Sequence, residues 1–450
     1  MEHPIVALAT PPGTSAIAVL RLSGKNCIAL FNQVFRGKDL TQVPSHTAHL
    51  GTIHDGERII DEVLVTVFRA PRSFTKEDSL EVSTHGSPYI VQETIQLLVR
   101  QGITYAKAGE FTQRAFLNGR FDLAQAEAVA DLIASESAAE HAIALRQMRG
   151  GFSEQLQTLR QDLLDFCALI ELELDFGEED VQFANRDELR RRIGDAQRFV
   201  AKLLDSFAWG NAIKTGVPTV IVGKPNAGKS TLLNALLNEE KAIVSDIPGT
   251  TRDVIEDQLT IGGIRFRFMD TAGLRETKDR IEQIGVARTQ AQMKKAALIL
   301  YLFDAQTFTA IDAKQVVQEL QALDVPFLMI ANQIDRTAHQ VPEALRAFVD
   351  IGISALQRRH LEELQALLLR TVARGDTGSQ EPITNLRHYE ALQSALAALQ
   401  AVDRGLDRGD TSDFLALDLR DALYHLGVIT GQVTNDEVLG SIFSKFCIGK

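Results

Sequence analysis

The sequence predicts a multidomain protein that combines α/β and all-helical parts, and three observations lead to this prediction. Short β-rich runs separated by turn residues occupy the first part of the chain. Apolar residues at helical spacing follow, and from about residue 215 strand-like and helix-like segments alternate. The last pattern is typical of βαβ units with a mostly parallel sheet. A chain of 450 residues has room for roughly two to four domains.

Composition and charge narrow the class of protein. Hydrophobic residues make up 45% of the chain and charged residues 24%, which excludes a disordered chain, a collagen and a coiled-coil rod. The net charge of −12 argues against non-specific nucleic-acid binding through bulk charge. A local basic patch is still compatible with this net charge. Three scattered cysteines predict a reducing compartment. Without a signal-peptide pattern or an apolar run of membrane-spanning length, we expect a cytoplasmic protein with no membrane partner.

The first part of the chain, residues 1–118, is predicted to be an α+β domain. Turn signals such as Pro11-Pro12-Gly13 separate its β-rich runs. A helix is predicted over Pro88–Arg100, because its apolar residues fall near one face. The predicted strands are Ile5–Ala9, Ala16–Leu22, Val63–Phe68 and Leu80–Ser83.

Two predicted helical segments flank a domain of a different kind. In the first, residues 119–212, apolar residues alternate steps of four and three, as in the seam of a helix bundle. The second, residues 377–450, follows a linker at 373–380, and we expect its last helix to open with a capping box at Thr434–Glu437. Residues 213–376 between them are predicted to form an inserted α/β domain. Its strand-like runs are Val217–Val222, Ile264–Met269, Ala297–Phe303, Pro326–Ala331 and Ile351–Ile353.

A phosphate-binding loop follows the first of these strands. Residues Gly223–Ser230 match G-x-x-x-x-G-K-S and precede a helical run at Leu232–Leu237, which is the context that this motif requires. Its backbone N–H groups and the helix N-terminus can surround phosphate oxygens. Lys229 is expected to reach the β- and γ-phosphates, and Ser230 to ligate Mg²⁺. The alternative interpretation is a glycine turn with a chance lysine.

Further segments follow in the order of a GTPase. Thr251 offers a hydroxyl to Mg²⁺, and Asp270 can hold the metal through water. Asp335, three residues after Asn332, can accept the ring N–H and the amino group of guanine, a donor pair that adenine lacks. The predicted GTP-binding residues are Asn226, Ala227, Gly228, Lys229, Ser230, Thr231, Ser245, Asp246, Ile247, Pro248, Gly249, Thr250, Thr251, Asp270, Thr271, Ala272, Gly273, Asn332, Asp335, Ser354 and Ala355.

Two positions depart from the usual GTPase pattern. Gln333 replaces the lysine of the base-binding box N-K-x-D, so we expect weaker GTP affinity, with guanine specificity retained through Asp335. Leu274 stands where Ras-like enzymes place the glutamine that orients the attacking water. Another group must therefore position water, although each charge nearby is otherwise an ordinary surface residue. The candidates are Arg275, Glu276, Asp279 and Glu282.

Over essentially its whole length the chain resembles the MnmE (TrmE) family of tRNA-modifying GTPases. The GTPase boxes are shared by many families, whereas the N-terminal strings and the final C-I-G-K are specific to this one. The segments that carry the resemblance are Thr10–Gly13, Leu20–Gly24, Gly109–Thr112, Arg114–Arg120, Asp122–Ala128, Gly223–Ser230, Ile247–Asp253, Asp270–Glu276 and Phe446–Lys450.

The resemblance implies a tetrahydrofolate-binding-like N-terminal domain that forms a homodimer, a helical domain made of two segments, and an inserted Ras-like GTPase domain. It implies a K⁺-stimulated GTP hydrolase that works with MnmG, a flavin- and NADH-dependent partner, on tRNA. Together they would add an aminomethyl or carboxymethylaminomethyl group at carbon 5 of the wobble uridine of certain tRNAs. The expected one-carbon donor is a tetrahydrofolate derivative, either 5-formyl- or methylene-tetrahydrofolate.

The resemblance also assigns residues to ions and to catalysis. GTPase domains of the family pair across the dimer, and K⁺ between them supplies the positive charge that an arginine finger would give. Glu282 aligns with the glutamate that orients the attacking water. The residues that align with K⁺ contacts are Asn226, Ser245, Ile247 and Thr250.

Folate contacts are likewise implied by resemblance. They are Arg21, Glu81, Arg120 and Lys450. Cations suit the glutamyl tail and a carboxylate suits the pterin, although ordinary surface ion pairs are the alternative interpretation. Lys76 and Ser87 replace glycines of the family, and a lost glycine can remove a positive-φ option or close ligand approach. Cys447 is a candidate nucleophile toward the uracil ring, or else a structural residue.

Two other functions compete with this one. A ribosome-assembly or signalling GTPase would use a similar switch, but the folate-like domain and the C-I-G-K tail argue against it. A folate enzyme with a vestigial GTPase domain is the other alternative. It is disfavoured by the intact phosphate- and metal-binding residues Lys229, Ser230, Thr251 and Asp270.

Overall fold

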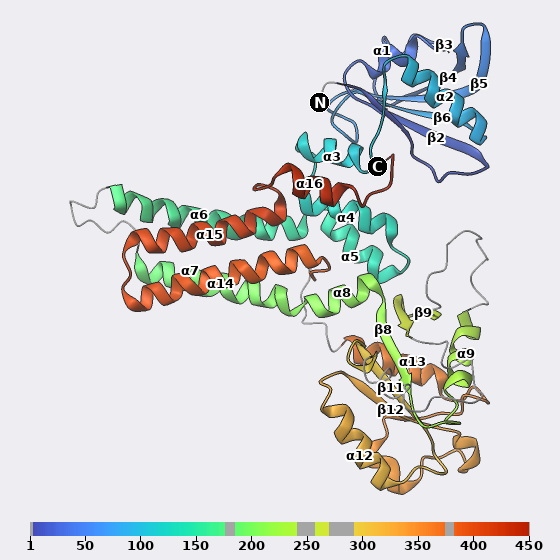
Figure 1. The fold of residues 1–450 in the computed structure, drawn as a ribbon, viewed down its shortest axis with the longest axis vertical. Coiled ribbons are helices and arrows are strands. Elements are labelled where there is room, and N and C mark those ends of the chain that lie inside the picture. Colours follow the sequence, from blue (N-terminus) through green and yellow to red (C-terminus); the bar gives the residue numbers. More distant parts are fainter. Residues whose placement is uncertain (1–2, 176–184, 241–256, 270–291, 374–381, 450) are drawn as a thin grey trace. The chain divides into compact units, whose positions relative to one another are not determined.

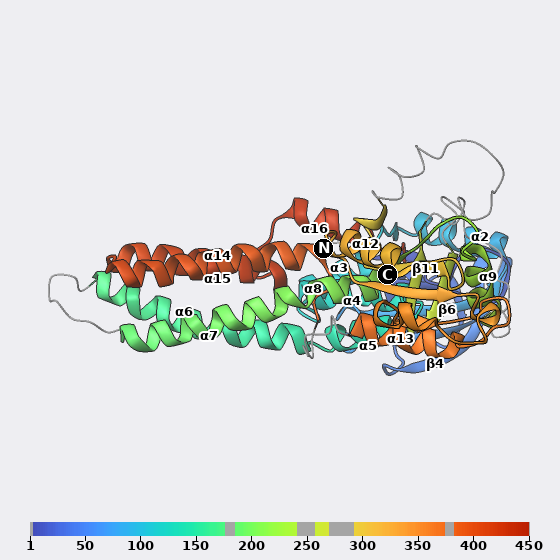
Figure 2. The ribbon, with the colours of Figure 1, turned by 90° about the horizontal axis from the view of Figure 1, so that it is seen from below.

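The computed structural model describes residues 3–175, 185–240, 257–269, 292–373 and 382–449 (Figures 1 and 2). The chain divides into two compact units, and both are discontinuous in sequence. The first contains residues 1–130, 147–161 and 423–450, and the second contains residues 131–146 and 162–422. The predicted four-segment division is finer than these two units and stays a prediction, and the predicted linker lies almost wholly outside the described residues.

A seven-stranded sheet forms the centre of the first unit, in the order β3-β4-β5-β6-β2-β1-β7. Neighbouring strands are antiparallel except for β1 and β7, which pair in parallel. Two helices contribute to its core: α1 (Cys27–Asn32) and α2 (Pro88–Arg100). The strands are β1 Ile5–Leu8, β2 Ser15–Ser23, β3 Phe35–Gly37, β4 Thr47–Asp55, β5 Arg58–Phe68, β6 Ser79–Gly86 and β7 Thr104–Tyr105.

Three helices from opposite ends of the sequence pack together in the same unit. They are α3 (Glu110–Leu117), α4 (Leu123–Ala134) and α16 (Asp436–Phe443). Phe443 of α16 and Leu123 of α4 belong to one buried cluster, to which Phe116 of α3 adds a partly buried ring. The C-terminal segment is therefore part of the unit that holds the N-terminal sheet.

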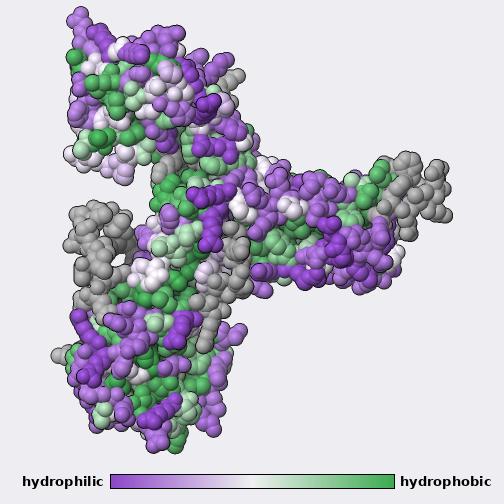
Figure 3. All heavy atoms as spheres, turned by 180° about the vertical axis from the view of Figure 1, so that it is seen from behind, coloured by the Kyte–Doolittle hydropathy of each residue, from purple (hydrophilic) through white to green (hydrophobic). Residues whose placement is uncertain are grey.

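Four long helices run side by side in both ribbon views (Figures 1 and 2). Leu189, Ile193, Ala196, Val200 and Leu203 recur at steps of three and four on α7 and are buried, as in a bundle. Hydrophilic residues prevail on the face of this bundle shown in Figure 3, which fits amphipathic helices with inward apolar stripes. The four are α6 (Gly151–Asp175), α7 (Arg186–Asp205), α14 (Leu386–Arg408) and α15 (Ser412–Thr430), and shorter α5 (Ala138–Met148) and α8 (Phe207–Thr215) adjoin them in sequence.

The second unit also contains a six-stranded sheet in the order β13-β12-β11-β8-β10-β9. All of its strands pair in parallel except the hairpin of β9 and β10. Separate buried clusters cover its two faces, one with α9 (Lys229–Glu240) and α13 (Leu361–Ala373), the other with α12 (Ala310–Gln321). The strands are β8 Val217–Val222, β9 Asp257–Ile261, β10 Ile264–Phe268, β11 Leu298–Asp304, β12 Phe327–Asn332 and β13 Ile351–Gly352.

This architecture confirms the predicted fold class, a multidomain protein of α/β and helical parts. Helices on both faces explain why strands such as β8 are apolar almost throughout. Within the described ranges, no helix combines the length and the apolarity that crossing a membrane requires.

The expected capping box at Thr434–Glu437 is wrong. The helix α16 begins at Asp436, so Asn435 is the N-cap, and its side-chain oxygen accepts a hydrogen bond from Val438 N at 2.9 Å. The Thr434 hydroxyl instead faces the Asn435 carbonyl at 3.4 Å. Asparagine caps a helix at least as well as threonine, so the later residue can take the position.

We predict that Asn435→Ala destabilises α16 by about 1 kcal/mol, because an amide of its first turn loses its acceptor. Hydrogen exchange followed by mass spectrometry should then show the α16 amides exchanging about five times faster. Thr434→Ala is the matched control and should leave their exchange unchanged. Faster exchange in the threonine variant alone would restore the capping box.

Candidate functional site

The loop between β8 and α9 is shaped by two glycines that no other residue could replace without displacing the backbone. Gly223 has φ +150°, and a Cβ there would lie 1.9 Å from the carbonyl oxygen of Leu302. Gly228 has φ +92°, and its Cβ would lie 2.3 Å from Asn332 Nδ2. Asn226 between them also has a left-handed backbone, with φ 62°. These close approaches fold the loop around a small concave space at the start of α9.

Lys229 lies across this loop. Its Nζ donates hydrogen bonds to the carbonyl oxygens of Gly223, at 2.8 Å, and Lys224, at 3.0 Å. Burial lowers the pKa of the Lys229 ammonium below its ordinary value. Two of the three N–H donors of the ammonium are used by these carbonyl groups, so the third is left for an anion such as a phosphate group in the cavity that Lys229 lines. Ser230 and Thr231 line the same cavity from the first turn of α9.

The side chain of Asn332 joins three loops at the carboxyl ends of the parallel strands. Its Nδ2 donates to the carbonyl oxygen of Ala227 at 2.8 Å, and its Oδ1 accepts from Ala355 N at 3.0 Å. Asn332 is buried, so both of these bonds are shielded from water. Nearby, the Ser354 hydroxyl donates to Asp335 Oδ1 at 2.6 Å and orients that carboxylate.

These loops enclose a cavity of about 420 Å³. Its phosphate-loop side is lined by residues of the G-x-x-x-x-G-K-S motif, and its other side by Asn332, Gln333 and Asp335. Because a carboxylate, that of Asp335, and an ammonium, that of Lys229, both line the cavity, a ligand with a donor-rich base and an anionic tail fits the arrangement. The described predicted residues that line it are Asn226, Gly228, Lys229, Ser230, Thr231, Asn332 and Asp335.

Gln333 contacts the phosphate-binding loop directly. Its Nε2 donates to the carbonyl oxygen of Asn226 at 2.9 Å, which ties the base-side loop to the phosphate-binding loop. Its Oε1 is shielded from solvent and has no hydrogen-bond partner among the described residues. The replacement therefore keeps a donor to the loop but removes a positive charge from the cavity.

Part of the predicted nucleotide and ion site lies outside the described residues. The residues concerned are Ser245, Asp246, Ile247, Pro248, Gly249, Thr250, Thr251, Asp270, Thr271, Ala272, Gly273 and Glu282. Of the proposed metal contacts, the structure therefore places only Asn226 and Ser230. Both line the cavity, in keeping with the oxygen ligands that Mg²⁺ and K⁺ take.

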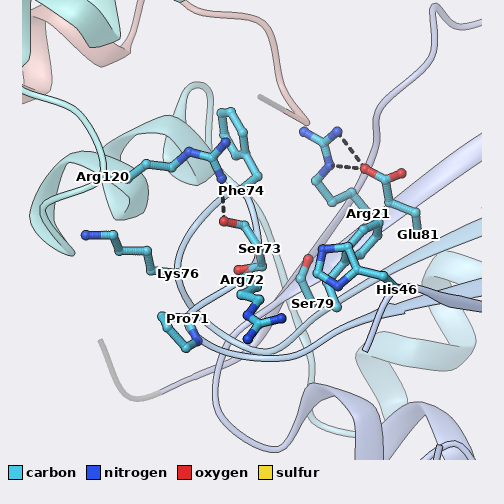
Figure 4. A pocket seen from close by; sticks show the side chains of 11 residues that line it. Arg21, His46, Pro71, Arg72, Ser73, Phe74, Lys76, Ser79, Glu81 and Arg120 are labelled. Carbon is cyan, nitrogen blue, oxygen red and sulfur yellow. Dashed lines mark hydrogen bonds and ion pairs between the residues drawn. The ribbon is translucent and has the colours of Figure 1, made fainter. Parts of the chain in front are cut away.

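A second cavity, of about 590 Å³, lies on the first unit (Figure 4). Arg21 on β2 and Glu81 on β6 are register partners, and Arg21 donates two hydrogen bonds to Glu81 Oε1 at 2.8 and 3.1 Å. The Arg21 guanidinium also lies 5.3 Å from the centre of the Phe74 ring. Three predicted folate residues, Arg21, Glu81 and Arg120, line this one cavity, and Lys450 lies outside the described residues.

Arg120 approaches the same aromatic ring from another direction. Its guanidinium lies 5.2 Å from the centre of Phe74 and 5.1 Å from that of Phe121, and Nη1 donates to the Ser73 carbonyl. Partial burial lowers the pKa of Arg120. The sequence analysis missed Phe74, whose only local signal was an aromatic residue in a turn-rich segment.

The two glycine replacements near this cavity have different outcomes. Lys76 adopts φ 58°, so a lysine occupies the left-handed conformation that favours glycine. Ser87 has φ −88° and is the N-cap of α2, a conformation and position that suit serine. Only the replacement at Lys76 therefore strains the backbone.

The C-terminal segment reaches this region. Cys447 O accepts from Gly109 N at 3.3 Å, and Ile448 forms a bridge with Ala108. Gly449 O accepts from Arg21 Nη1 at 3.4 Å, and a Cβ on Gly449 would lie 2.2 Å from the Leu8 carbonyl oxygen. The Cys447 side chain is exposed and does not line the cavity.

Comparisons with known proteins agree over the whole chain. Two family models match, described as the GTP-binding protein TrmE N-terminus, over residues 4–120, and the MnmE helical domain, over residues 123–447. A protein of Cytophaga hutchinsonii is 54% identical, covering 99% of this chain and 97% of the relative. Proteins of Christiangramia forsetii and Bacteroides fragilis are 51% and 49% identical over the full length of both chains. All three relatives carry the name tRNA modification GTPase MnmE.

We predict that Asp335→Asn exchanges the base preference of the 420 Å³ cavity. An asparagine side chain offers one acceptor and one donor, which complement the N1–H and the C2 carbonyl of xanthine. The 2-amino group of guanine, in contrast, would meet the amide N–H of the asparagine, so that two donors face each other. Titration of GDP and xanthosine diphosphate should show GDP weakened by at least about a hundredfold and the xanthine nucleotide gained.

Ser354→Ala is the matched control for this exchange. It removes the hydrogen bond that orients Asp335 without changing what the carboxylate offers. We expect GDP to weaken by only about fivefold, with no gain of xanthosine diphosphate. Unchanged GDP affinity in the Asp335→Asn variant would show that Asp335 does not contact the base.

Proposed function

The chain belongs to the MnmE family of tRNA modification GTPases, and from this membership we propose that it hydrolyses GTP to GDP and phosphate while it modifies tRNA. The observation that carries the proposal is the single cavity that has Lys229 and the phosphate-binding loop on one side and Asp335 on the other. Lys229 would hold the phosphates, Ser230 would be a ligand of a Mg²⁺ ion that neutralises their charge, and Asp335 would select guanine.

The proposed hydrolysis is stimulated by K⁺. Asn226 supports this step, because it lines the phosphate end of the cavity. Ser245, Ile247 and Thr250 are the other proposed K⁺ contacts, and Mg²⁺ would be shared by Ser230 and Thr251. A bound K⁺ would supply positive charge where phosphoryl oxygens gain negative charge. Glu282 is proposed to orient the attacking water.

The second cavity is proposed to bind a tetrahydrofolate derivative. Glu81 offers two acceptor oxygens for the donor edge of a pterin, and Arg21, Arg120 and Lys450 offer cations for the glutamyl carboxylates. Both guanidinium groups lie over the ring of Phe74, 5.3 and 5.2 Å from its centre, so this ring positions the two cations beside the cavity. When bound, the folate would supply the one-carbon unit.

The proposed product is a uridine that carries an aminomethyl or carboxymethylaminomethyl group at carbon 5, at the wobble position of certain tRNAs. A homodimer formed by the N-terminal domains and a complex with MnmG are the proposed assemblies, in the cytoplasm. Cys447 is exposed, as a thiol that adds to a uracil ring must be. Its role in catalysis is part of this proposal, and a structural role is the alternative.

We predict that Lys229→Ala abolishes the modification, because the phosphates lose the half-buried cation of the phosphate-binding loop. In a strain that lacks the gene, mass spectrometry of tRNA nucleosides should show loss of the 5-aminomethyl-type uridines. The wild-type chain should restore them and Lys229→Ala should not. Lys224→Ala is a control, because that lysine forms an exposed ion pair with Asp312 and should still restore modification. An unchanged nucleoside profile in the deletion strain would contradict the proposal.

A further inference from the structure

The second cavity is lined by more basic than acidic side chains, and this excess of positive charge exceeds what the proposed folate contacts explain. The cavity is lined by four basic side chains, Arg21, Arg72, Lys76 and Arg120, against one carboxylate, Glu81. Arg21 is neutralised by its ion pair with Glu81. Within the ranges that the structure describes, the other three form no ion pair, because Lys76 and Arg120 donate to backbone carbonyls instead. In Figure 4, Lys76 and Arg120 lie on the side away from the Arg21–Glu81 pair, and Arg72 lies lower in the view, beside Pro71.

Lys76 lines the cavity with a backbone conformation that lysine disfavours. Its φ of 58° lies in the left-handed region, where a side chain costs conformational energy and glycine does not. Its Nζ donates to the Gly119 carbonyl at 2.7 Å, which fixes the ammonium beside the cavity. A strained residue that lines a cavity is a reason to look for a function of its side chain.

Arg120 is a second cation that lines the cavity and donates to a backbone carbonyl instead of a carboxylate. Its guanidinium lies 5.2 and 5.1 Å from the ring centres of Phe74 and Phe121, and of its N–H groups only Nη1 has a partner among the described residues, the Ser73 carbonyl, so the others are left for a ligand. Arg72, Lys76 and Arg120, which form no ion pair among the described residues, already outnumber the two carboxylates of a folate with a single glutamate, before the proposed contacts Arg21 and Lys450 are counted. The excess is matched when the folate carries a chain of γ-linked glutamates, since each added residue brings one carboxylate.

We propose that Arg72, Lys76 and Arg120 form a subsite for the oligo-γ-glutamate tail, so that this chain selects polyglutamylated over monoglutamylated tetrahydrofolates. The proposal rests on the folate site proposed above and specifies the form of folate that it takes. The contacts are charge-assisted and partly exposed, so the preference should decline as the salt concentration rises.

Binding of 5-formyl-tetrahydrofolate monoglutamate and triglutamate to the full chain tests the proposal by calorimetry. We expect the triglutamate to bind about tenfold tighter, the size of one charge-assisted contact. Lys76→Gln removes the charge and should reduce this ratio below about threefold, while the monoglutamate affinity changes less than about twofold. Lys76→Arg should retain the ratio, and Lys38→Gln, an exposed lysine that does not line the cavity, should leave it unchanged.

The variant Lys76→Gly distinguishes loss of the positive charge from loss of folding stability. Glycine suits φ 58°, so thermal stability should be equal or higher while the triglutamate preference falls. Equal affinities of the two folates for the wild-type chain would overturn the subsite and leave the folate site standing. No binding of either folate would overturn the folate site itself. A Lys76→Gln variant that binds tRNA less tightly but keeps the folate ratio would assign these cations to tRNA and overturn the proposal.

Discussion

The nucleotide cavity depends on two hydrogen bonds of one buried side chain, that of Asn332. It joins the carbonyl oxygen of Ala227 in the phosphate-binding loop to the backbone N–H of Ala355 after the last strand. The phosphate-binding loop, 105 residues before Asn332, and the loop of Ala355, 23 residues after it, are thereby held together before any ligand binds. Loss of the amide would leave a buried donor and acceptor unpaired and let the loops separate. Gly228 serves the same contact, because any side chain there would meet Asn332 Nδ2.

The second cavity depends in a comparable way on contacts between residues that are far apart in sequence. Arg21 is held by Glu81 on the neighbouring strand and also meets the Gly449 carbonyl near the end of the chain. Gly449 and Gly109 allow this approach, since a Cβ on either would meet backbone atoms within 2.5 Å. The final residues thus belong to the same compact unit as the N-terminal sheet, which gives a physical reason for a specific C-terminal motif.

Much of the fold was predictable, because its signals are local. The strand Val217–Val222 and the helix Pro88–Arg100 have the predicted bounds. A short apolar run predicts the strand, and a proline at the first helical position marks the start of the helix, so both signals are local in sequence. The phosphate-binding loop was predictable for the same reason. The cap of α16 was assigned one residue too early, because Thr434 and Asn435 compete for one position and the packing of the helix decides between them.

The parts of the sites that were not predictable arise from tertiary contacts. Phe74 and Arg72 reach the second cavity through a loop whose course the local sequence does not specify. The left-handed backbone at Lys76 was indicated only by the glycine that the family has there, because lysine itself disfavours it. The sequence marked Gln333 as an unusual residue, but its hydrogen bond to the Asn226 carbonyl oxygen was not predictable. In each case a side chain does its work through a partner far away in sequence.

Calorimetric titration of GTP and of ATP into the full chain tests the central claim, a preformed cavity that selects guanine. The account predicts that GTP binds and that ATP binds at least about a hundredfold more weakly, because adenine cannot donate two hydrogen bonds to Asp335. The absolute affinity for GTP should be modest, since Gln333 brings no positive charge to the cavity. Near-equal affinities for GTP and ATP would contradict the account.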